Sequence, residues 1–192
     1  MRKYVNDYKT VLQTDEFGFE RKVVVYIGNE YEVNLDEQDL KKFRGYSLFL
    51  VGLMVLGQIA AGFIANQGMY TFYISLAYIF TFLPLYLLID GALRWPKEKR
   101  LFKRDEVELS FYRLKKAVKF MLALTGASIV GEIVFMVFFL RGFDLKEIYF
   151  LVVELIVGAA DFLLLRLNKG IKVNEIAKGD DGSQANSIDS AD

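Results

Sequence analysis

Residues 118–140 read VKFMLALTGASIVGEIVFMVFFL, an apolar stretch of about 20 residues or a little more with one acidic residue, Glu132. As an α-helix that rises about 1.5 Å per residue, this stretch can cross about 30 Å of hydrocarbon. Three comparable stretches lie at residues 46–65, 70–92 and 147–167. A soluble domain of 192 residues would not need four such stretches, so the chain is predicted to be an integral membrane protein.

The composition agrees with this prediction and excludes several kinds of chemistry. Hydrophobic residues make up 54% of the chain, against a usual value of roughly 45–50%. The sequence contains no histidine and no cysteine, which excludes histidine-based acid–base triads, thiol nucleophiles, ordinary zinc sites and disulfides. It contains no glycine-rich phosphate loop either. We therefore expect no enzymatic activity, no cofactor and no nucleic-acid partner, while binding of another metal stays open.

Basic residues are distributed unevenly around the four stretches. They precede the first span at residues 41–44, lie between the second and third at 91–117, and follow the fourth at 166–172. The connection at residues 66–69 carries no charge, and residues 141–146 carry only two basic groups. Since lysine and arginine accumulate on the cytoplasmic side, both termini and the middle loop are predicted to be cytoplasmic.

The middle loop, residues 94–117, is the most basic part of the chain. Residues 91–117 hold nine basic and four acidic groups, a net charge of +5. Such a loop favours an anionic lipid surface, although the same charges also serve as the orientation signal alone. The candidate contacts with anionic lipid are Arg104, Arg113, Lys115 and Lys116.

The first 45 residues have a different pattern, typical of short strands. Residues 22–33 are rich in β-branched and aromatic residues, Gly28-Asn29 is typical of a turn, and residues 15–18 form a second turn-like sequence. Two or three strands are marginal on their own in water. This β-rich appendage is therefore expected to pack on the membrane base, on another membrane protein or on its own copy in a homodimer.

Two helix starts are predicted from capping patterns. Asn34 with Glu37 predicts a helix that continues into the first span through Gly45. Asp105 with Glu108 predicts an amphipathic cytoplasmic helix that continues into the third span. Its apolar residues follow steps of four and three: Val107, Phe111, Leu114, Val118 and Met121.

The predicted fold is an all-α membrane protein, a bundle of four transmembrane helices with a small β-rich N-terminal cytoplasmic appendage. The appendage and a linker helix occupy residues 1–45, and the bundle with its amphipathic loop occupies residues 46–167. The tail at residues 168–192 is predicted to be disordered, because after Ala177 it is acidic, small and nearly free of apolar residues.

Acidic residues occur inside the spans, whose interiors lack lysine and arginine. The third span contains Glu132, and the fourth contains Glu154 and Asp161. A carboxylate at the centre of a membrane costs a few kcal/mol on insertion scales, so each acid needs a partner, a water path or a proton. By residue count, Glu132, Glu154, Gln58 and Tyr78 lie at a common depth of about 10–12 Å below the outer ends of their helices.

Three interpretations of this layer remain open. In the first, Glu132 and Glu154 face each other and bind a proton or cation, Gln58 and Tyr78 are hydrogen-bonding neighbours, and Asp161 is an inner relay. In the second, the protonated acids only fix how the helices assemble. In the third, the acids face a partner protein.

Part of the chain resembles a known group of proteins. The stretch SFYRLKKA at residues 110–117, followed by Gly131-Glu132 in the third span, is similar to small, uncharacterised four-span membrane proteins of Gram-positive bacteria. The resemblance implies a location in the bacterial plasma membrane and transfers no catalytic residue.

Two functions from different classes follow from these observations. The first is a non-enzymatic membrane accessory or interaction protein that contacts a partner or anionic lipid through its appendage and basic helix. The alternative is a small proton- or cation-coupled transporter or channel subunit that uses the intramembrane acids.

Overall fold

The computed structural model describes residues 2–14, 19–96, 101–140 and 142–176. Within this part, four helices are long and apolar enough to cross a membrane, as predicted. Their bounds are α1 Glu37–Phe63, α2 Phe72–Leu93, α4 Arg113–Phe138 and α5 Leu145–Lys169. A short helix α3, Arg104–Val107, and a π-helical turn, Glu108–Tyr112, directly precede α4.

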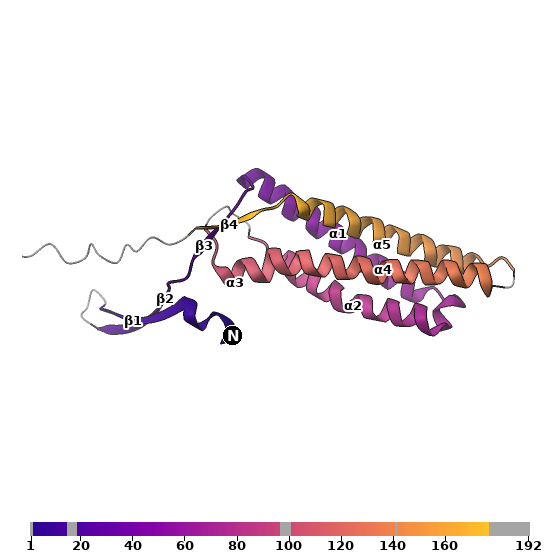
Figure 1. Cartoon of the computed structure of the whole chain (residues 1–192), viewed down its shortest axis with the longest axis horizontal. Coiled ribbons are helices and arrows are strands. Elements are labelled where there is room, and N and C mark those ends of the chain that lie inside the picture. The colour runs from indigo at the N-terminus through magenta and orange to yellow at the C-terminus, as the bar shows by residue number, and fades with distance from the viewer. Residues whose placement is uncertain (1, 15–18, 97–100, 141, 177–192) are drawn as a thin grey trace, which may run out of the picture. The chain divides into compact units, whose positions relative to one another are not determined.

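The four long helices form a bundle in which each helix contacts two neighbours (Figure 1). The order around the bundle is α1, α2, α4, α5 and back to α1. We call the end with the 64–71 and 139–144 connections the loop end, and the opposite end, where Arg94 and Arg166 lie, the basic end.

The buried faces of the helices repeat at steps of three and four residues. This spacing is typical of left-handed bundles in which the side chains of one helix fit between those of the next. On α5 the buried residues alternate between polar and apolar, so a buried polar residue recurs every seven positions. The buried residues of this repeat are Glu147, Phe150, Glu154, Val157, Asp161, Leu164 and Asn168.

An aromatic cluster closes the basic end of the bundle. The Trp95 ring lies between those of Phe43 and Phe111, with ring centroids 4.2 Å apart in both pairs. Trp95 is only 2% exposed, so it packs inside the bundle rather than facing lipid. The predicted amphipathic pattern from Val107 to Met121 is confirmed, because all five of its apolar residues are buried.

A second compact unit is built from three separate segments: the described residues of 1–34, 100–107 and 173–192. A 3₁₀ helix, Arg2–Asp7, leads into β1, Tyr8–Thr14, which pairs antiparallel with β2, Glu20–Tyr26. A second antiparallel pair joins β3, Glu30–Val33, to β4, Val173–Ile176, and Tyr31 forms a bridge with Phe102.

Two details differ from the sequence-based expectation, and three regions on which predictions were made lie outside the described residues. Gly28-Asn29 separates β2 from β3, but these strands do not pair with each other; the partner of β3 is β4. The expected disordered tail is wrong for its first residues, because α5 continues to Lys169 and residues 173–176 form β4. The turn at residues 15–18, the basic residues among 97–100 and the tail at 177–192 lie outside the described residues.

The predicted helix caps were placed incorrectly by two residues. Helix α1 begins at Glu37 with Asp36 as its N-cap, so Asn34 is not the cap, although the helix does continue through Gly45 as expected. Helix α3 begins at Arg104, and the Glu106 carboxylate accepts a hydrogen bond of 3.1 Å from the backbone N–H of Lys103. Glu106 therefore has the capping role that the sequence assigned to Glu108.

Candidate functional site

The first part of the site is a buried hydrogen-bond network that joins three helices. The Gln58 side-chain N–H on α1 donates a bond of 3.1 Å to the Glu154 carboxyl on α5. The Gln58 side-chain oxygen accepts a bond of 3.1 Å from the Thr81 hydroxyl on α2, and the Gln58 backbone oxygen accepts one of 2.6 Å from the Tyr78 hydroxyl. The predicted neighbours Gln58, Tyr78 and Glu154 are thus brought together, and Thr81 joins them.

The second part is a pair of acids at the loop end. Glu147, in the first turn of α5, accepts hydrogen bonds from the Asn66 side chain at 2.7 Å and from the backbone N–H groups of Gln67 at 2.6 Å and Gly68 at 3.2 Å. The Glu132 carboxyl on α4 lies beside that of Glu147, and both residues are fully buried. A side chain at Gly68 would displace the Glu132 carboxyl, which lies directly against this glycine.

The two carboxyls of this pair are expected to share one proton. A contact between two carboxyls is a hydrogen bond only when one of them is protonated, and with both ionised neither oxygen of Glu132 has a donor. Glu147 already accepts three hydrogen bonds and lies at a helix N-terminus, two features that stabilise a carboxylate. The proton therefore belongs on Glu132.

The third part is Asp161, one heptad beyond Glu154 on α5. Asp161 is fully buried, and within the described part of the chain neither of its carboxyl oxygens has a hydrogen-bond partner. The hydroxyls of Thr125 and Ser128 on α4 are likewise buried and unpartnered. Gly158, between Glu154 and Asp161, packs against the Thr125 side chain, which places these hydroxyls in the same stretch of the bundle.

We call Glu132, Glu147, Glu154 and Asp161 the acid column. Glu147, Glu154 and Asp161 are seven residues apart on one face of α5, and so about 10.5 Å apart along the helix at 1.5 Å per residue. Together they span about 21 Å of the bundle. A buried polar atom normally has a hydrogen-bond partner in the protein or in an ordered water. The buried carboxyl and hydroxyl oxygens of this column that lack a partner among the described residues are therefore suited to binding water or protons.

The structure departs from the expected pairing of Glu132 with Glu154. Glu132 lies beside Glu147, and Glu154 is bound by Gln58. Glu147 was missed because it is the first residue of the fourth apolar stretch, and Asn66 because it lies in a short connection without a pattern. The seven-residue repeat of polar residues on α5 is the sequence signal that includes Glu147.

The basic residues expected to contact anionic lipid lie in different surroundings. Arg113 forms an ion pair with Asp90, which also binds Arg94 at 2.8 Å. Lys115 and Lys116 are exposed. Arg104 belongs to the other compact unit, where its guanidinium lies 3.9 Å from the Asp7 carboxylate.

The column does not have the geometry of a metal centre. Among the described residues, no three carboxylates converge closely enough to hold a metal ion. In comparisons with known proteins, no family model, no curated protein and no solved structure matches the chain. The chemistry of the site is therefore argued from its geometry alone.

Proposed function

We propose that the chain is a proton-coupled membrane protein, a small transporter or channel subunit whose acid column takes up and releases protons inside the bilayer. The observation that carries the proposal is the placement of Glu132, Glu154 and Asp161 on the bundle interior, where no group among the described residues donates a hydrogen bond to five of their six carboxyl oxygens. Buried acids without a compensating base are uncommon in spans and mark proton or ion pathways.

Protons would enter at the loop end. The Glu132–Glu147 pair lies directly under residues 66–68, of which Gln67 is exposed. We propose this pair as the first proton-binding site of the path. When a proton moves from one of two adjacent carboxyls to the other, one neutral and one charged carboxyl remain, so no additional charge is created in the low-dielectric interior.

The hydroxyls of Ser128 and Thr125 would connect the carboxyls of the acid column. Carboxyls spaced by about 10 Å are too far apart for a direct transfer. A hydroxyl both donates and accepts a hydrogen bond, so it can pass a proton between neighbouring groups or waters. The two hydroxyls lie on α4 within the stretch that faces Gly158 of α5.

An apolar layer follows the column toward the basic end. Beyond Asp161, helices α2, α4 and α5 contribute fully buried apolar side chains: Leu88, Val118, Met121 and Leu164. Such a layer opposes a continuous file of water. The column is therefore expected to be open to protons from one side at a time, which is the requirement for coupling rather than leakage.

A proton suits this column better than a metal cation does. A bound Ca²⁺ or Mg²⁺ needs several oxygens around one point, and the described carboxylates are spread along the helix axis instead.

The proposal is tested by proton flux into vesicles that contain the reconstituted full-length protein. The variants Glu154→Gln and Asp161→Asn should each reduce proton flux at least tenfold, because the neutral amides keep the shape of the protonated acids but cannot release a proton. Asp39→Asn is the matched control, since it neutralises an exposed carboxylate outside the column. Wild-type flux no greater than that of empty vesicles, or unchanged flux in both variants, would contradict the proposal.

A second candidate function is interaction with a partner through the β1–β2 hairpin. Its strands pair only with each other among the described residues, and several apolar side chains are exposed, including Leu12 at 58% and Val24 at 64%. Exposed strand edges with apolar residues are typical docking surfaces for a further strand. Because the chain lacks cysteine, Val24→Cys gives a unique crosslinking site in native membranes; recovery of monomer alone would contradict this candidate.

The location that fits both functions is a bacterial plasma membrane, with both termini in the cytoplasm. The asymmetry of basic residues supports this orientation. Single cysteines at Gln67 and Lys115 test it, because an impermeant thiol reagent applied to intact cells should label only the first. Labelling of Lys115→Cys alone would reverse the orientation.

A further inference from the structure

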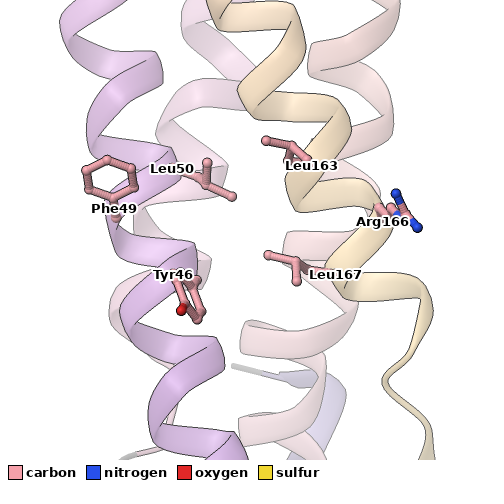
Figure 2. A pocket seen from close by; sticks show the side chains of 6 residues that line it. All are labelled: Tyr46, Phe49, Leu50, Leu163, Arg166 and Leu167. Atoms are coloured by element: carbon pink, nitrogen blue, oxygen red, sulfur yellow. The ribbon is translucent and has the colours of Figure 1, made fainter.

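A groove with a volume of about 560 Å³ lies between α1 and α5 in the half of the bundle nearer the basic end. Its walls consist of Tyr46, Phe49 and Leu50 from α1 and of Leu163, Arg166 and Leu167 from α5. Figure 2 shows Leu163 and Leu167 directed toward α1, opposite Tyr46 and Leu50, with Arg166 on α5 at a level between the two leucines. None of these residues belongs to the acid column.

The lining has the character of a site for a hydrocarbon chain. Four of the six residues are leucine or phenylalanine. Phe49 is 68% and Leu163 is 49% exposed, so protein does not cover the groove. Since α1 and α5 are both of membrane-spanning length, bilayer lipid is what covers this surface. The volume lies within the range of about 300–1,000 Å³ typical of small-molecule sites.

Arg166 gives this groove a preference for charge. Its guanidinium is exposed, and among the described residues no carboxylate pairs with it. An arginine within a spanning helix needs an anion or water for its charge. Guanidinium groups bind phosphate through two parallel hydrogen bonds.

We propose that the groove is a binding site for one anionic phospholipid. An acyl chain lies against Phe49, Leu50 and Leu163, and the phosphate is held by Arg166 at the edge of the groove. A zwitterionic phospholipid fits less well, because its own ammonium competes for the phosphate and adds a second positive charge beside Arg166. The site is distinct from the lysines of the middle loop, and it does not depend on the function of the acid column.

Lipid retention by the full-length protein tests the site. The purified protein is equilibrated with mixed micelles of phosphatidylglycerol and phosphatidylcholine, and the bound lipids are counted by native mass spectrometry. Wild type should keep one phosphatidylglycerol at least fivefold more often than phosphatidylcholine. Arg166→Gln should abolish this preference, whereas Lys169→Gln, which removes the same charge one turn away and outside the groove, should keep it.

A second variant tests the apolar wall separately. Leu163→Trp fills the groove and should lower retention of both lipids, with no change in the thermal midpoint of the protein beyond a few degrees. Equal loss of preference in Arg166→Gln and Lys169→Gln would show a general charge effect and overturn the proposal. Equal retention of the two lipids by wild type would overturn it as well.

Discussion

The side-chain amide of Gln58 donates a hydrogen bond of 3.1 Å to the carboxyl of Glu154 in the middle of the bundle. The same amide accepts a hydrogen bond from Thr81 through its oxygen, so its orientation is fixed from two sides. One glutamine therefore connects α1 with both α2 and α5. No neighbouring apolar contact can replace this connection, because each partner is fully buried.

We predict that Gln58→Leu destabilises the bundle by about 2–3 kcal/mol. The substitution keeps the volume but leaves the Glu154 carboxyl without its donor, and an unsatisfied buried polar group costs about 1–3 kcal/mol. The Thr81 hydroxyl loses its bond to Gln58 and keeps the one it donates to the Tyr78 backbone oxygen. The measurement is unfolding by denaturant in mixed micelles. Gln67→Leu is the control, since the side chain of Gln67 is exposed and should change stability by less than about 0.5 kcal/mol; equal effects would contradict the prediction.

The two acids at the loop end should respond unequally to neutralisation. Glu132→Gln is expected to change stability by less than about 1 kcal/mol, because its amide N–H replaces the shared proton as donor to Glu147. Glu147→Gln should cost about 1–3 kcal/mol, because one of the acceptors of the Asn66, Gln67 and Gly68 N–H groups is lost.

The same denaturant unfolding measures both variants of this pair. A larger loss in Glu132→Gln than in Glu147→Gln would show that Glu132 is the ionised partner. Asp144→Asn is a suitable control, because asparagine keeps an oxygen for the hydrogen bond from the Lys146 backbone N–H and Asp144 lies outside the acid pair.

Two glycines of the bundle should tolerate alanine very differently. A Cβ at Gly57 would lie 2.5 Å from a methyl group of Val157, which is fully buried, whereas a Cβ at Gly126 would meet nothing within 4 Å. Gly57→Ala should therefore be less stable than Gly126→Ala by about 1–3 kcal/mol, the usual cost of overpacking. Equal thermal midpoints for the two variants would mean that α1 and α5 can separate without cost.

Tyr8 in the second compact unit should ionise at a higher pH than an ordinary tyrosine. Burial raises the pKa of Tyr8 above its ordinary value of 10.0, and the charge of Asp105, which accepts a hydrogen bond of 3.2 Å from the Tyr8 hydroxyl, raises it further. The folded unit thus keeps a proton that the unfolded chain releases near pH 10. The stability from this contact is complete below pH 10 and is lost as the pH rises through the raised pKa.

The measurement is the ultraviolet absorbance of phenolate as a function of pH. The curve of the Tyr8→Phe variant is subtracted from that of the wild type, and the difference is the titration of Tyr8. Its midpoint should lie above pH 10 and should move downward in Asp105→Asn, because that variant removes the neighbouring charge. A midpoint that Asp105→Asn leaves unchanged would show that the carboxylate is not a neighbour in solution.

Much of the bundle could be predicted from the sequence because hydrophobic length alone determines the spans. Residues 70–92 were expected as the second span, and α2 occupies Phe72–Leu93. The amphipathic approach to the third span followed from its three-and-four spacing. The acids at Glu132, Glu154 and Asp161 were visible because charge is rare in such stretches, and all three are buried inside the bundle.

The pairing within the site could not be predicted, because it depends on helix rotation and on a short connection. Residue counting placed Glu132 level with Glu154, which is wrong: Glu132 lies beside Glu147, one heptad and so about 10.5 Å from Glu154 along α5. The axial offset between α4 and α5 sets this pairing together with helix rotation, and the sequence specifies neither. The donors from residues 66–68 are largely backbone N–H groups, which no sequence pattern identifies. Strand β4 was missed for a related reason: a four-residue strand has almost no local signal when its partner lies far away in the chain.

The pairing of β3 with β4 has a consequence for biosynthesis. Residues 30–33 leave the ribosome long before residues 173–176, and all four apolar helices are synthesised in between. The early strand therefore lacks its partner until residues 173–176 have been synthesised. During that interval its unpaired edge is available to chaperones or to neighbouring nascent chains, and the sheet can close only after residues 173–176 have left the ribosome.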